Sequence, residues 1–239
     1  MLRTLLALKS KETREDAQFR ILRRVAKLIM PTYRLGWPHL LWWKDKEFNS
    51  FLAHFDELTG CNSDRRWMVH QLLKWIAAVP GDTAECGVYA GATSYLICQA
   101  IAGTTRTHFM FDSFEGLSQP IDHDGAYWTK EDMKSPLERA VSNLPFRNVS
   151  FHKGWIPDRF SDVADRRFAF VHIDVDLYQP TLDSFEFFYP RMNRGGLILC
   201  DDYAFSTCPG ANKAMDEFMS GKPEQIISPP SGAGFIVKA

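Results

Sequence analysis

Hydrophobic positions follow two different patterns along the chain, one before Pro80 and one after it. In the first part apolar residues recur at helical spacing, and they predict helices over residues 12–30, 45–58 and 64–78. Pro31 ends the first of these helices, and Pro80-Gly81-Asp82 ends the last. We expect a helical extension over residues 1–63 and a main domain over residues 64–239.

After Pro80 short apolar runs alternate with helical stretches, which predicts crossover connections and a mainly parallel sheet with helices on both faces. The run FAFVHID is apolar nearly throughout, as in a central strand that is buried on both faces. Strands are expected over residues 83–88, 107–112, 149–153, 168–174, 196–201, 224–228 and 234–238. Helices are expected over residues 93–101, 137–143, 181–189 and 211–218.

The end of the chain departs from this alternation. Its last two expected strands are separated only by PPSGAG, which leaves no room for a crossover helix. Such a pair must be antiparallel. An α/β fold with a seven-stranded, mostly parallel sheet and an antiparallel last strand resembles the Rossmann-like class I methyltransferase fold.

Composition adds few constraints. The 239 residues are 45% hydrophobic and 24% charged, with a formal net charge of -1, so nothing global indicates nucleic-acid binding. Three of the five cysteines, Cys86, Cys98 and Cys200, lie in apolar runs as small core residues, which suits a reducing compartment. With no stretch of about 18 apolar residues, a cytoplasmic location is expected.

Charge is uneven near the N-terminus, where Arg20, Arg23, Arg24 and Lys27 lie close together. They indicate either a solvated helix face or a basic helix that contacts an anionic membrane surface or an acidic substrate. The aromatic-rich segment that follows, with Trp37, Trp42 and Trp43, suits a subunit interface, and a homodimer is expected.

The first candidate for a binding site is AECGVYAGATS, residues 84–94, which follows a strand and opens a helix. Gly87 and Gly91 allow a ligand to approach the backbone. The spacing is not the GxGxxG of a dinucleotide site, and Glu85 is available to receive an ammonium group. A zwitterionic amino-acid end therefore fits this turn, and a tight strand-to-helix turn without a ligand is the alternative.

The second candidate is Asp112, which ends the next strand in FMFDSFEG, 21 residues after Gly91. An acid at this place in nucleotide-binding α/β folds accepts hydrogen bonds from ribose hydroxyls. Capping of a turn by Asp112 or Ser113 is the alternative. Two acids at adjacent strand ends suit a ligand that is both nucleoside and amino acid, as S-adenosylmethionine is.

The third candidate is a group of aspartates at the ends of two further strands. Asp174 and Asp176 follow one strand, and Asp201 and Asp202 follow the next. If these strands are parallel neighbours, the carboxylates converge, repel one another and favour a divalent cation such as Mg²⁺. Capping of the next helix by one aspartate is the alternative. The DxD pattern of Asp174 and Asp176 also fits a metal-dependent nucleotide-sugar glycosyltransferase.

Other polar residues lie near these motifs. His172, inside the strand before Asp174, is expected to be a satisfied core histidine rather than a ligand. The loop IDHDGAYW, which carries His123, Tyr127 and Trp128, is either a solvated connection or a cover over the site that contacts the acceptor.

The motifs AECGVYAGATS, FDSFEGL, FHKGWIPD, FVHIDVDLYQPTLDSFEFFYP and GGLILCDDYAFSTCPGANKAMDEF together resemble the macrocin-type O-methyltransferases, the TylF/MycF family of sugar methyltransferases. The resemblance covers roughly residues 65–220. It implies an enzyme that uses S-adenosylmethionine and a Mg²⁺-type ion to methylate a hydroxyl of a sugar or glycosylated natural product. A catechol-type O-methyltransferase, which uses the same cofactor and a divalent metal, is one alternative. A binding module that has lost activity is another.

The resemblance also implies roles for individual residues. Asp174, Asp201 and Asp202 would hold the metal, and Asp174 would also be the catalytic base. Asp174-Val175-Asp176 departs from the more common Asp-Gly-Asp of the family, so a valine adds bulk beside the acceptor. The expected cofactor contacts are Glu85 and Gly87 at the methionine end, Tyr89, Gly91 and Ser94 in the same segment, Asp112 and Ser113 at the ribose, and Gly154 and Trp155 near the adenine. The expected acceptor contacts are His123, Tyr127, Trp128 and Tyr178.

Overall fold

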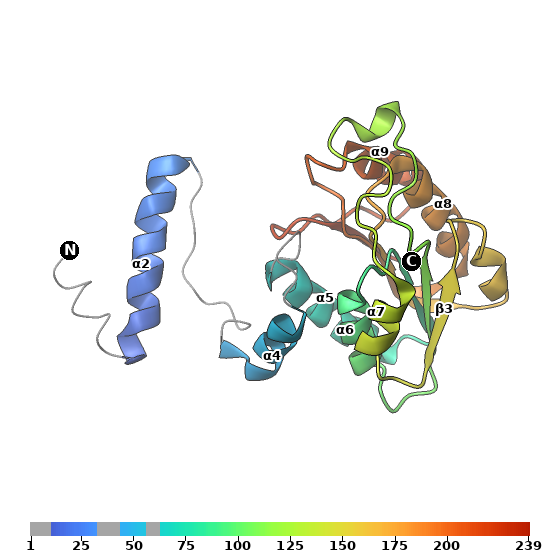
Figure 1. The fold of residues 1–239 in the computed structure, drawn as a ribbon, viewed down its shortest axis with the longest axis horizontal. Coiled ribbons are helices and arrows are strands. Elements are labelled where there is room, and N and C mark those ends of the chain that lie inside the picture. Colours follow the sequence, from blue (N-terminus) through green and yellow to red (C-terminus); the bar gives the residue numbers. More distant parts are fainter. Residues whose placement is uncertain (1–10, 33–43, 56–62) are drawn as a thin grey trace. The chain divides into compact units, whose positions relative to one another are not determined.

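The computed structural model describes residues 11–32, 44–55 and 63–239, and the chain divides into two units, Met1–His54 and Phe55–Ala239 (Figure 1). The first unit contains helices α2 (Lys11–Ile29) and α4 (Lys46–His54), as the periodicity predicted. Within α2 the basic side chains of Arg23, Arg24 and Lys27 are exposed. No helix in the described ranges combines the length and the apolar character that crossing a membrane requires.

The second unit is built on one sheet of six strands in the order β3-β2-β1-β4-β5-β6. The first five strands are parallel to their neighbours, and β6 is antiparallel to β5. This arrangement confirms the expected α/β class and the antiparallel end. The strands are β1 (Asp82–Cys86), β2 (His108–Asp112), β3 (Val149–Lys153), β4 (Phe168–Ile173), β5 (Met192–Cys200) and β6 (Gly234–Val237).

Helices cover both faces of this sheet because alternate side chains of each strand point to opposite faces. On one face Ala84, Phe111 and Ile198 form a core with residues of α8 and α9, while the other face packs against α5, α6 and α7. The helices are α5 (Ser63–Trp75), α6 (Ala92–Ala100), α7 (Leu137–Asn143), α8 (Tyr178–Phe188) and α9 (Pro209–Met219). Short 3₁₀ turns are η1 (Ile76–Ala78), η2 (Asp122–Asp124), η3 (Phe160–Val163) and η4 (Tyr189–Arg191).

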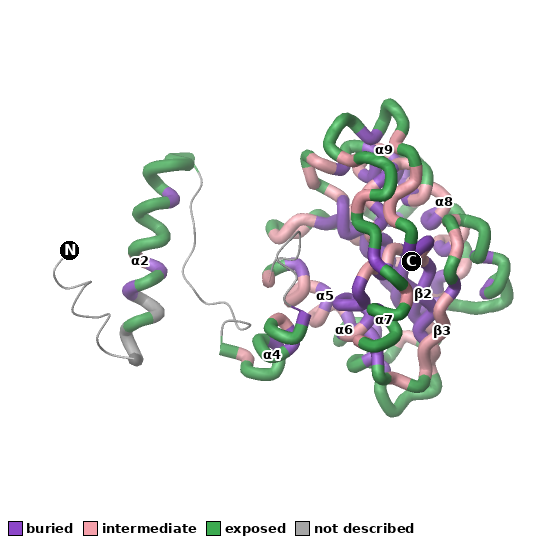
Figure 2. Tube along the Cα trace, viewed as in Figure 1, coloured by how far each residue is buried: buried purple, intermediate pink, exposed green. Residues whose placement is uncertain are grey.

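Burial is concentrated on the central strands, and the outer connections are exposed (Figure 2). Every residue of β4 is buried, as the apolar run FAFVHID predicted. The cysteines Cys86, Cys98 and Cys200 are each 0% exposed, which confirms them as core residues. Cys61 lies outside the described residues, as do Trp37, Trp42 and Trp43.

The expected strand over residues 224–228 does not form. Ile227 makes only an isolated antiparallel bridge with Phe235. Pro223, Pro229 and Pro230 flank this segment and lack the N–H that a strand ladder needs. The described residues therefore form six strands rather than seven, although the close antiparallel return at PPSGAG is as predicted.

The order of the strands positions the functional site. Strand β1 lies between β2 and β4, so the connections after β1 and β4 leave in opposite directions along the sheet. In open α/β sheets, ligands bind in the crevice that forms at the carboxyl ends of the strands at such a switch point. The backbone keeps the two ends together, because the Asp174 N–H donates to the Cys86 carbonyl at 2.8 Å.

Candidate active site

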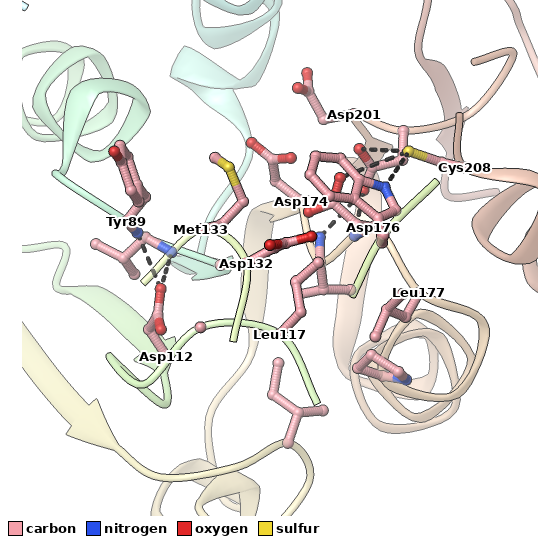
Figure 3. A pocket seen from close by; sticks show the side chains of 18 of the residues that line it. Tyr89, Asp112, Leu117, Asp132, Met133, Asp174, Asp176, Leu177, Asp201 and Cys208 are labelled. Carbon is pink, nitrogen blue, oxygen red and sulfur yellow. Dashed lines mark hydrogen bonds between the residues drawn. The ribbon is translucent and has the colours of Figure 1, made fainter. Parts of the chain in front are cut away.

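A cavity of about 880 Å³ opens at the carboxyl ends of the central strands (Figure 3). Asp112 and Tyr89 lie at one end, and Asp174, Asp176 and Asp201 lie at the other. The volume falls within the usual range of small-molecule sites, roughly 300–1,000 Å³. All three candidate motifs of the sequence therefore meet in one cavity.

Asp112 holds the glycine-rich turn in place at the first end of the cavity. Its Oδ2 accepts the N–H groups of Val88 at 2.7 Å and Tyr89 at 2.9 Å, and its Oδ1 accepts the N–H of Phe114 at 2.6 Å. Each carboxylate oxygen carries two lone pairs, so Oδ2 is fully used and one lone pair remains on Oδ1 for a ligand hydroxyl. Asp112 thus caps the turn and also lines the cavity, and its contact with a ribose stays a prediction.

Gly87 is required for a reason that the sequence did not reveal. Its φ is +84°, and a Cβ at this position would overlap the carbonyl oxygen of Asp174. Only glycine allows the loop after β1 to lie this close to the end of β4. Its small size therefore brings the two halves of the cavity floor together as well as exposing the backbone to a ligand.

Glu85 lies in the floor of the cavity and is 2% exposed. Its Oε1 is 3.0 Å from Nδ1 of His172, and its Oε2 accepts the hydroxyl of Ser94 and lies 3.7 Å from Nε2 of His108. Burial alone would raise the pKa of this carboxyl, but the hydrogen bonds and positive potential of the two histidines lower it to about 2. Glu85 is therefore a carboxylate at neutral pH.

At the other end of the cavity, Asp202 organises the loop that follows β4. Its Oδ2 accepts the N–H groups of Val175 at 3.1 Å and Asp176 at 2.8 Å. Asp176 adopts a positive φ of 59°, a conformation that few residues other than glycine, asparagine and aspartate adopt readily. The backbone thus turns sharply and brings the Asp176 carboxylate against Asp202.

This acidic end carries uncompensated negative charge. Burial raises the pKa of Asp202 to about 7, and the nearby charge of Asp174 adds to the shift. The pKa of Asp176 is also raised well above its ordinary value, first by burial and then by Asp202 and Asp174. Several neighbouring carboxyl groups with raised pKa values are typical of a cation-binding site, because a bound cation would stabilise their ionised forms.

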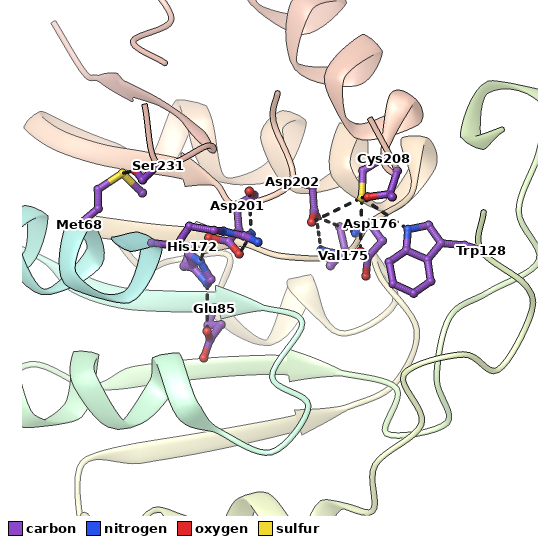
Figure 4. A network of polar contacts seen from close by, with 12 residues as sticks. Met68, Glu85, Trp128, His172, Val175, Asp176, Asp201, Asp202, Cys208 and Ser231 are labelled. Carbon is purple, nitrogen blue, oxygen red and sulfur yellow. Dashed lines mark hydrogen bonds and ion pairs between the residues drawn. The ribbon is translucent and has the colours of Figure 1, made fainter. Parts of the chain in front are cut away.

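Within the described part of the chain, Asp201 is the member of this acidic end that forms an ion pair with an arginine (Figure 4). The Arg65 guanidinium forms an ion pair with its Oδ2 and donates to its backbone carbonyl at 2.8 Å. On the other side, Nε2 of His172 lies 3.5 Å from Asp201 Oδ1. One oxygen of Asp201 is therefore held by α5, and the other faces β4.

Among the residues that the structure describes, potential metal ligands form two groups in which the ligand atoms lie within 4.8 Å of one another. The first group is His172, Asp174 and Asp201, and the second is Asp176, Asp202 and Cys208. The expected trio of Asp174, Asp201 and Asp202 is divided between these groups, although all three line the same cavity. Joint coordination by the trio stays a prediction.

The acceptor residues expected from the sequence separate into two pairs. Tyr127 and Trp128 line the cavity, with their rings 4.9 Å apart, and the Trp128 indole N–H donates to Cys208 Sγ at 3.4 Å. His123 and Tyr178 lie outside the cavity wall, in an exposed cluster where the Tyr178 hydroxyl donates to Glu217 Oε2 at 2.6 Å. Neither residue lines the cavity, and their contact with an acceptor stays a prediction.

The reason for this separation is the docking of the loop. Asp124, 2% exposed, accepts the Tyr178 N–H at 2.6 Å and its carboxylate packs against Gly210 of α9. The turn η2 is thereby fixed on the ends of α8 and α9, which carries His123 to the outer surface near Lys213. Only the later part of the loop returns to the cavity.

The remaining residues that were expected to contact the cofactor divide in a similar way. Ser113 and Trp155 line the cavity, whereas Gly91, Ser94 and Gly154 lie outside its wall. Ser94 instead bonds Glu85 from behind, and the Gly154 N–H donates to the Asp112 carbonyl at 3.0 Å.

Sequence reasoning missed Arg65 and Cys208. Arg65 shares a buried stripe of α5 with Val69 and Leu73, at the i, i+4, i+8 spacing. A charged residue on an apolar stripe indicates a buried ion pair, so this pattern could have found it. Cys208 had no such signal, because only the fold brings the start of α9 against Asp176.

The match to known proteins is strongest over the second unit. The model of the macrocin O-methyltransferase (TylF) family matches residues 64–229. A tetracenomycin rhamnosyl 4'-O-methyltransferase of Streptomyces olivaceus is 32% identical over 148 residues, 56% of this chain and 57% of that protein. Demethyldecarbamoylnovobiocin O-methyltransferase of Streptomyces niveus is 33% identical over 159 residues, 59% of this chain and 58% of that protein. The chain thus matches a little over half the length of these relatives.

The solved structure of the O-methyltransferase NovP has the same fold, with a TM-score of 0.64 and 24% identity over 74% of this chain and 81% of that one. This likeness confirms the Rossmann-like class I methyltransferase architecture. The family match extends over well more than half of the chain and includes the glycine-rich turn, Asp112 and both aspartate pairs. The chain therefore belongs to the macrocin O-methyltransferase (TylF) family.

Proposed function

We propose that this protein is an S-adenosylmethionine- and divalent-metal-dependent O-methyltransferase that methylates a hydroxyl of a sugar or a glycosylated natural product. The observation that carries the proposal is the single cavity with a cofactor-type end at Asp112 and an acidic end at Asp174 and Asp201. Membership of the TylF family supports it. The rhamnosyl group in the name of one relative motivates the choice of a sugar acceptor.

At the cofactor end the proposed contacts follow from the chemical groups of the methyl donor S-adenosylmethionine. The Asp112 carboxylate and the half-buried turn around Tyr89 would receive the ribose hydroxyls, with Ser113 beside them. The ammonium of the methionine end would lie over Gly87 and the charge of Glu85. Trp155, which is 37% exposed at the cavity, would lie near the adenine ring.

At the acidic end the residues fit a divalent cation, because several carboxylates converge with raised pKa values. Asp174 and Asp201 have ligand atoms within 4.8 Å of each other, and Asp202 lies on the same cavity wall. Oxygen ligands of this kind suit Mg²⁺ or Mn²⁺. When bound, such an ion supplies charge that orients neighbouring hydroxyls and lowers their pKa.

The chain's own residues supply placement and a base. Methyl transfer requires an acceptor oxygen opposite the leaving sulfur, so the main task of the cavity is orientation. Asp174 is half-buried at the acidic end of the cavity, and its carboxylate would receive the hydroxyl proton. Trp128 and Tyr127 would cover the acceptor and exclude water.

The test combines chelation with a variant of one ligand. We expect Asp201→Asn, or excess EDTA, to abolish methyl transfer from S-adenosylmethionine to a panel of glycosides. Binding of S-adenosylhomocysteine should still be measurable by calorimetry in both cases, because its contacts lie at the other end of the cavity. Full activity in excess EDTA would contradict the metal requirement.

Two alternative functions can be distinguished from the proposed one by the ligand that the protein binds and by the acceptor that it methylates. A catechol-type O-methyltransferase would share cofactor and metal, so catechols belong in the acceptor panel beside glycosides. A nucleotide-sugar glycosyltransferase built on Asp174 and Asp176 would bind UDP with Mn²⁺, and family membership gives it no support. A homodimer and a cytoplasmic location stay predictions.

A further inference from the structure

A row of buried polar side chains leads from Glu85 through His172 to Asp201 (Figure 4), and the Arg65 guanidinium forms an ion pair with Asp201. Nδ1 of His172 is 3.0 Å from Glu85 Oε1, and Nε2 of the same ring is 3.5 Å from Asp201 Oδ1. This row links the floor of the proposed cofactor end to a proposed metal ligand.

The sheet register makes this row possible. Glu85 of β1 is directly opposite His172 of β4, and Asp201 follows Cys200, whose partner in β4 is Ile173. Three adjacent parallel strands therefore each contribute one side chain to the same face. Helix α5 closes the row with Arg65.

Each member of the row is shielded from solvent. The exposed fractions are 2% for Glu85, 0% for His172, 4% for Asp201 and 8% for Arg65. Water therefore cannot screen these charges or replace their hydrogen bonds, so each group fixes the orientation of the next. A change at one end would have to reach the other through the contact between His172 and Asp201.

The contact between His172 and Asp201 is the weakest one in this row of side chains, and its length can change. Glu85 is an acceptor-only carboxylate, so the proton on the near side of the ring lies on Nδ1. The far nitrogen, Nε2, makes no hydrogen bond with any residue in the described part of the chain. At 3.5 Å the gap to Asp201 is longer than a hydrogen bond, so this junction can shorten when either neighbour is reoriented.

We propose that His172 is a positioning residue that couples the two ends of the cavity, so that the cofactor and the divalent cation strengthen each other's binding. The inference rests on the proposed function, because it assigns Glu85 to the cofactor end and Asp201 to the metal. A ligand that orders Glu85 also fixes His172, and the Asp201 carboxylate is then presented to the cation with less reorganisation. Coupling of this kind is reciprocal.

The experiment measures binding rather than turnover. S-adenosylhomocysteine is titrated into the full chain by calorimetry, with and without saturating Mg²⁺, and Mg²⁺ is titrated with and without S-adenosylhomocysteine. In the wild type we expect each ligand to lower the Kd of the other by roughly fivefold or more. In His172→Asn the side-chain amide keeps a donor for Glu85 but ends short of Asp201, so the mutual effect should fall below about twofold.

His108→Asn is the matched control. His108 is also 0% exposed and approaches Glu85 from β2, with Nε2 3.7 Å from Glu85 Oε2, and its other contacts are Thr83 Oγ1 at 3.0 Å and Ser94 Oγ at 3.3 Å. It lies on the side of Glu85 away from Asp201, so this variant should keep the wild-type mutual effect. Loss of the effect in both variants would assign it to Glu85 alone and overturn the role of His172.

The outcomes separate this inference from the proposed function. Independent binding of both ligands to the wild type overturns the coupling and leaves the methyltransferase proposal intact. Absence of any Mg²⁺ binding overturns both the coupling and the metal requirement. If His172→Asn does not fold, Arg65→Lys tests the other end of the same row, and unchanged coupling in that variant overturns the proposal.

Discussion

Two buried carboxyl groups of this protein have pKa values that are shifted in opposite directions. Glu85 and Asp202 are 2% and 4% exposed, and burial by itself raises the pKa of both. Two histidines and a serine surround Glu85, and its pKa is lowered to about 2. Asp202 faces the negative charge of Asp174, and its pKa is raised to about 7.

The difference shows which centre the protein completes by itself. At Glu85 the folded chain provides donors for both carboxylate oxygens, so the anion belongs to the structure. At the acidic end Arg65 balances Asp201, and the repulsion among Asp174, Asp176 and Asp202 remains. The repulsion among these carboxylates is therefore left for a bound cation to relieve, because Arg65 pairs with Asp201.

The largest expected effect comes from removing the charge that is already balanced. Glu85→Gln leaves two buried histidines without their anionic partner and should lower the free energy of unfolding by about 3 kcal/mol. Asp202→Asn removes a repulsion and keeps an oxygen for the two backbone amides, so it should not destabilise the metal-free protein. Thermal unfolding in EDTA measures both. A larger loss of stability in Asp202→Asn would contradict the comparison.

The pH dependence of stability sharpens the same contrast. The pKa of Asp202 is about 7 in the folded protein against an ordinary 3.8, so between these values the folded state binds the extra proton. Stability of the metal-free protein should therefore fall as pH rises from about 4 to 7. Glu85 has the opposite sign, because its contribution is complete above 4.5 and is lost as pH falls towards 2.

Unfolding temperatures at pH 5 and pH 7.5 in EDTA test this sign. We expect a decrease of roughly 5 °C at the higher pH, since each kcal/mol shifts the midpoint by about 2–4 °C in a protein of this size. Asp202→Asn should remove most of the decrease, and Mg²⁺ should reverse it in the wild type. A midpoint that rises with pH in EDTA and is unaffected by the substitution would show that the acidic end is already compensated.

Much of this fold followed from periodicity. The apolar run of β4, the helical spacing of α7 and the antiparallel return at the end of the sheet all matched the structure, because each depends on local pattern. The strand expected over residues 224–228 failed, because the prolines around it remove ladder donors that an apolar pattern does not register.

The site was less predictable, because it depends on contacts between distant segments. Asp112 and the aspartate pairs followed from their places at strand ends, where parallel topology brings them together. His172 was expected to be a satisfied core histidine, and one of its nitrogens is, but Nε2 makes no hydrogen bond with a described residue. His123 does not line the cavity because Asp124 docks the loop on α8, and the sequence pattern could not reveal this contact between residues 54 positions apart.

A smaller effect should come from weakening the internal partner of Asp201. Arg65→Lys keeps the positive charge but cannot bond both the carboxylate and the backbone carbonyl as the guanidinium does. We expect the Kd for Mg²⁺ to rise by about tenfold, as for other partners that orient a metal ligand, while the Kd for S-adenosylhomocysteine without metal stays the same. A tighter Mg²⁺ complex would indicate instead that Arg65 competes with the cation.

The smallest effects concern the residues expected to contact the acceptor, where Trp128 and Tyr178 offer a test variant and its control. Trp128 lines the cavity beside Cys208, whereas the Tyr178 hydroxyl bonds Glu217 on the exposed surface. Trp128→Phe keeps an aromatic ring but loses contact area and the indole N–H, so the acceptor KM should rise by about threefold, equivalent to less than about 1 kcal/mol. Tyr178→Phe should leave KM and kcat unchanged, because an exposed pair of this kind contributes little. The opposite ranking would place the acceptor over the outer ends of α8 and α9, and the acidic end of the cavity would then no longer be where the hydroxyl reacts.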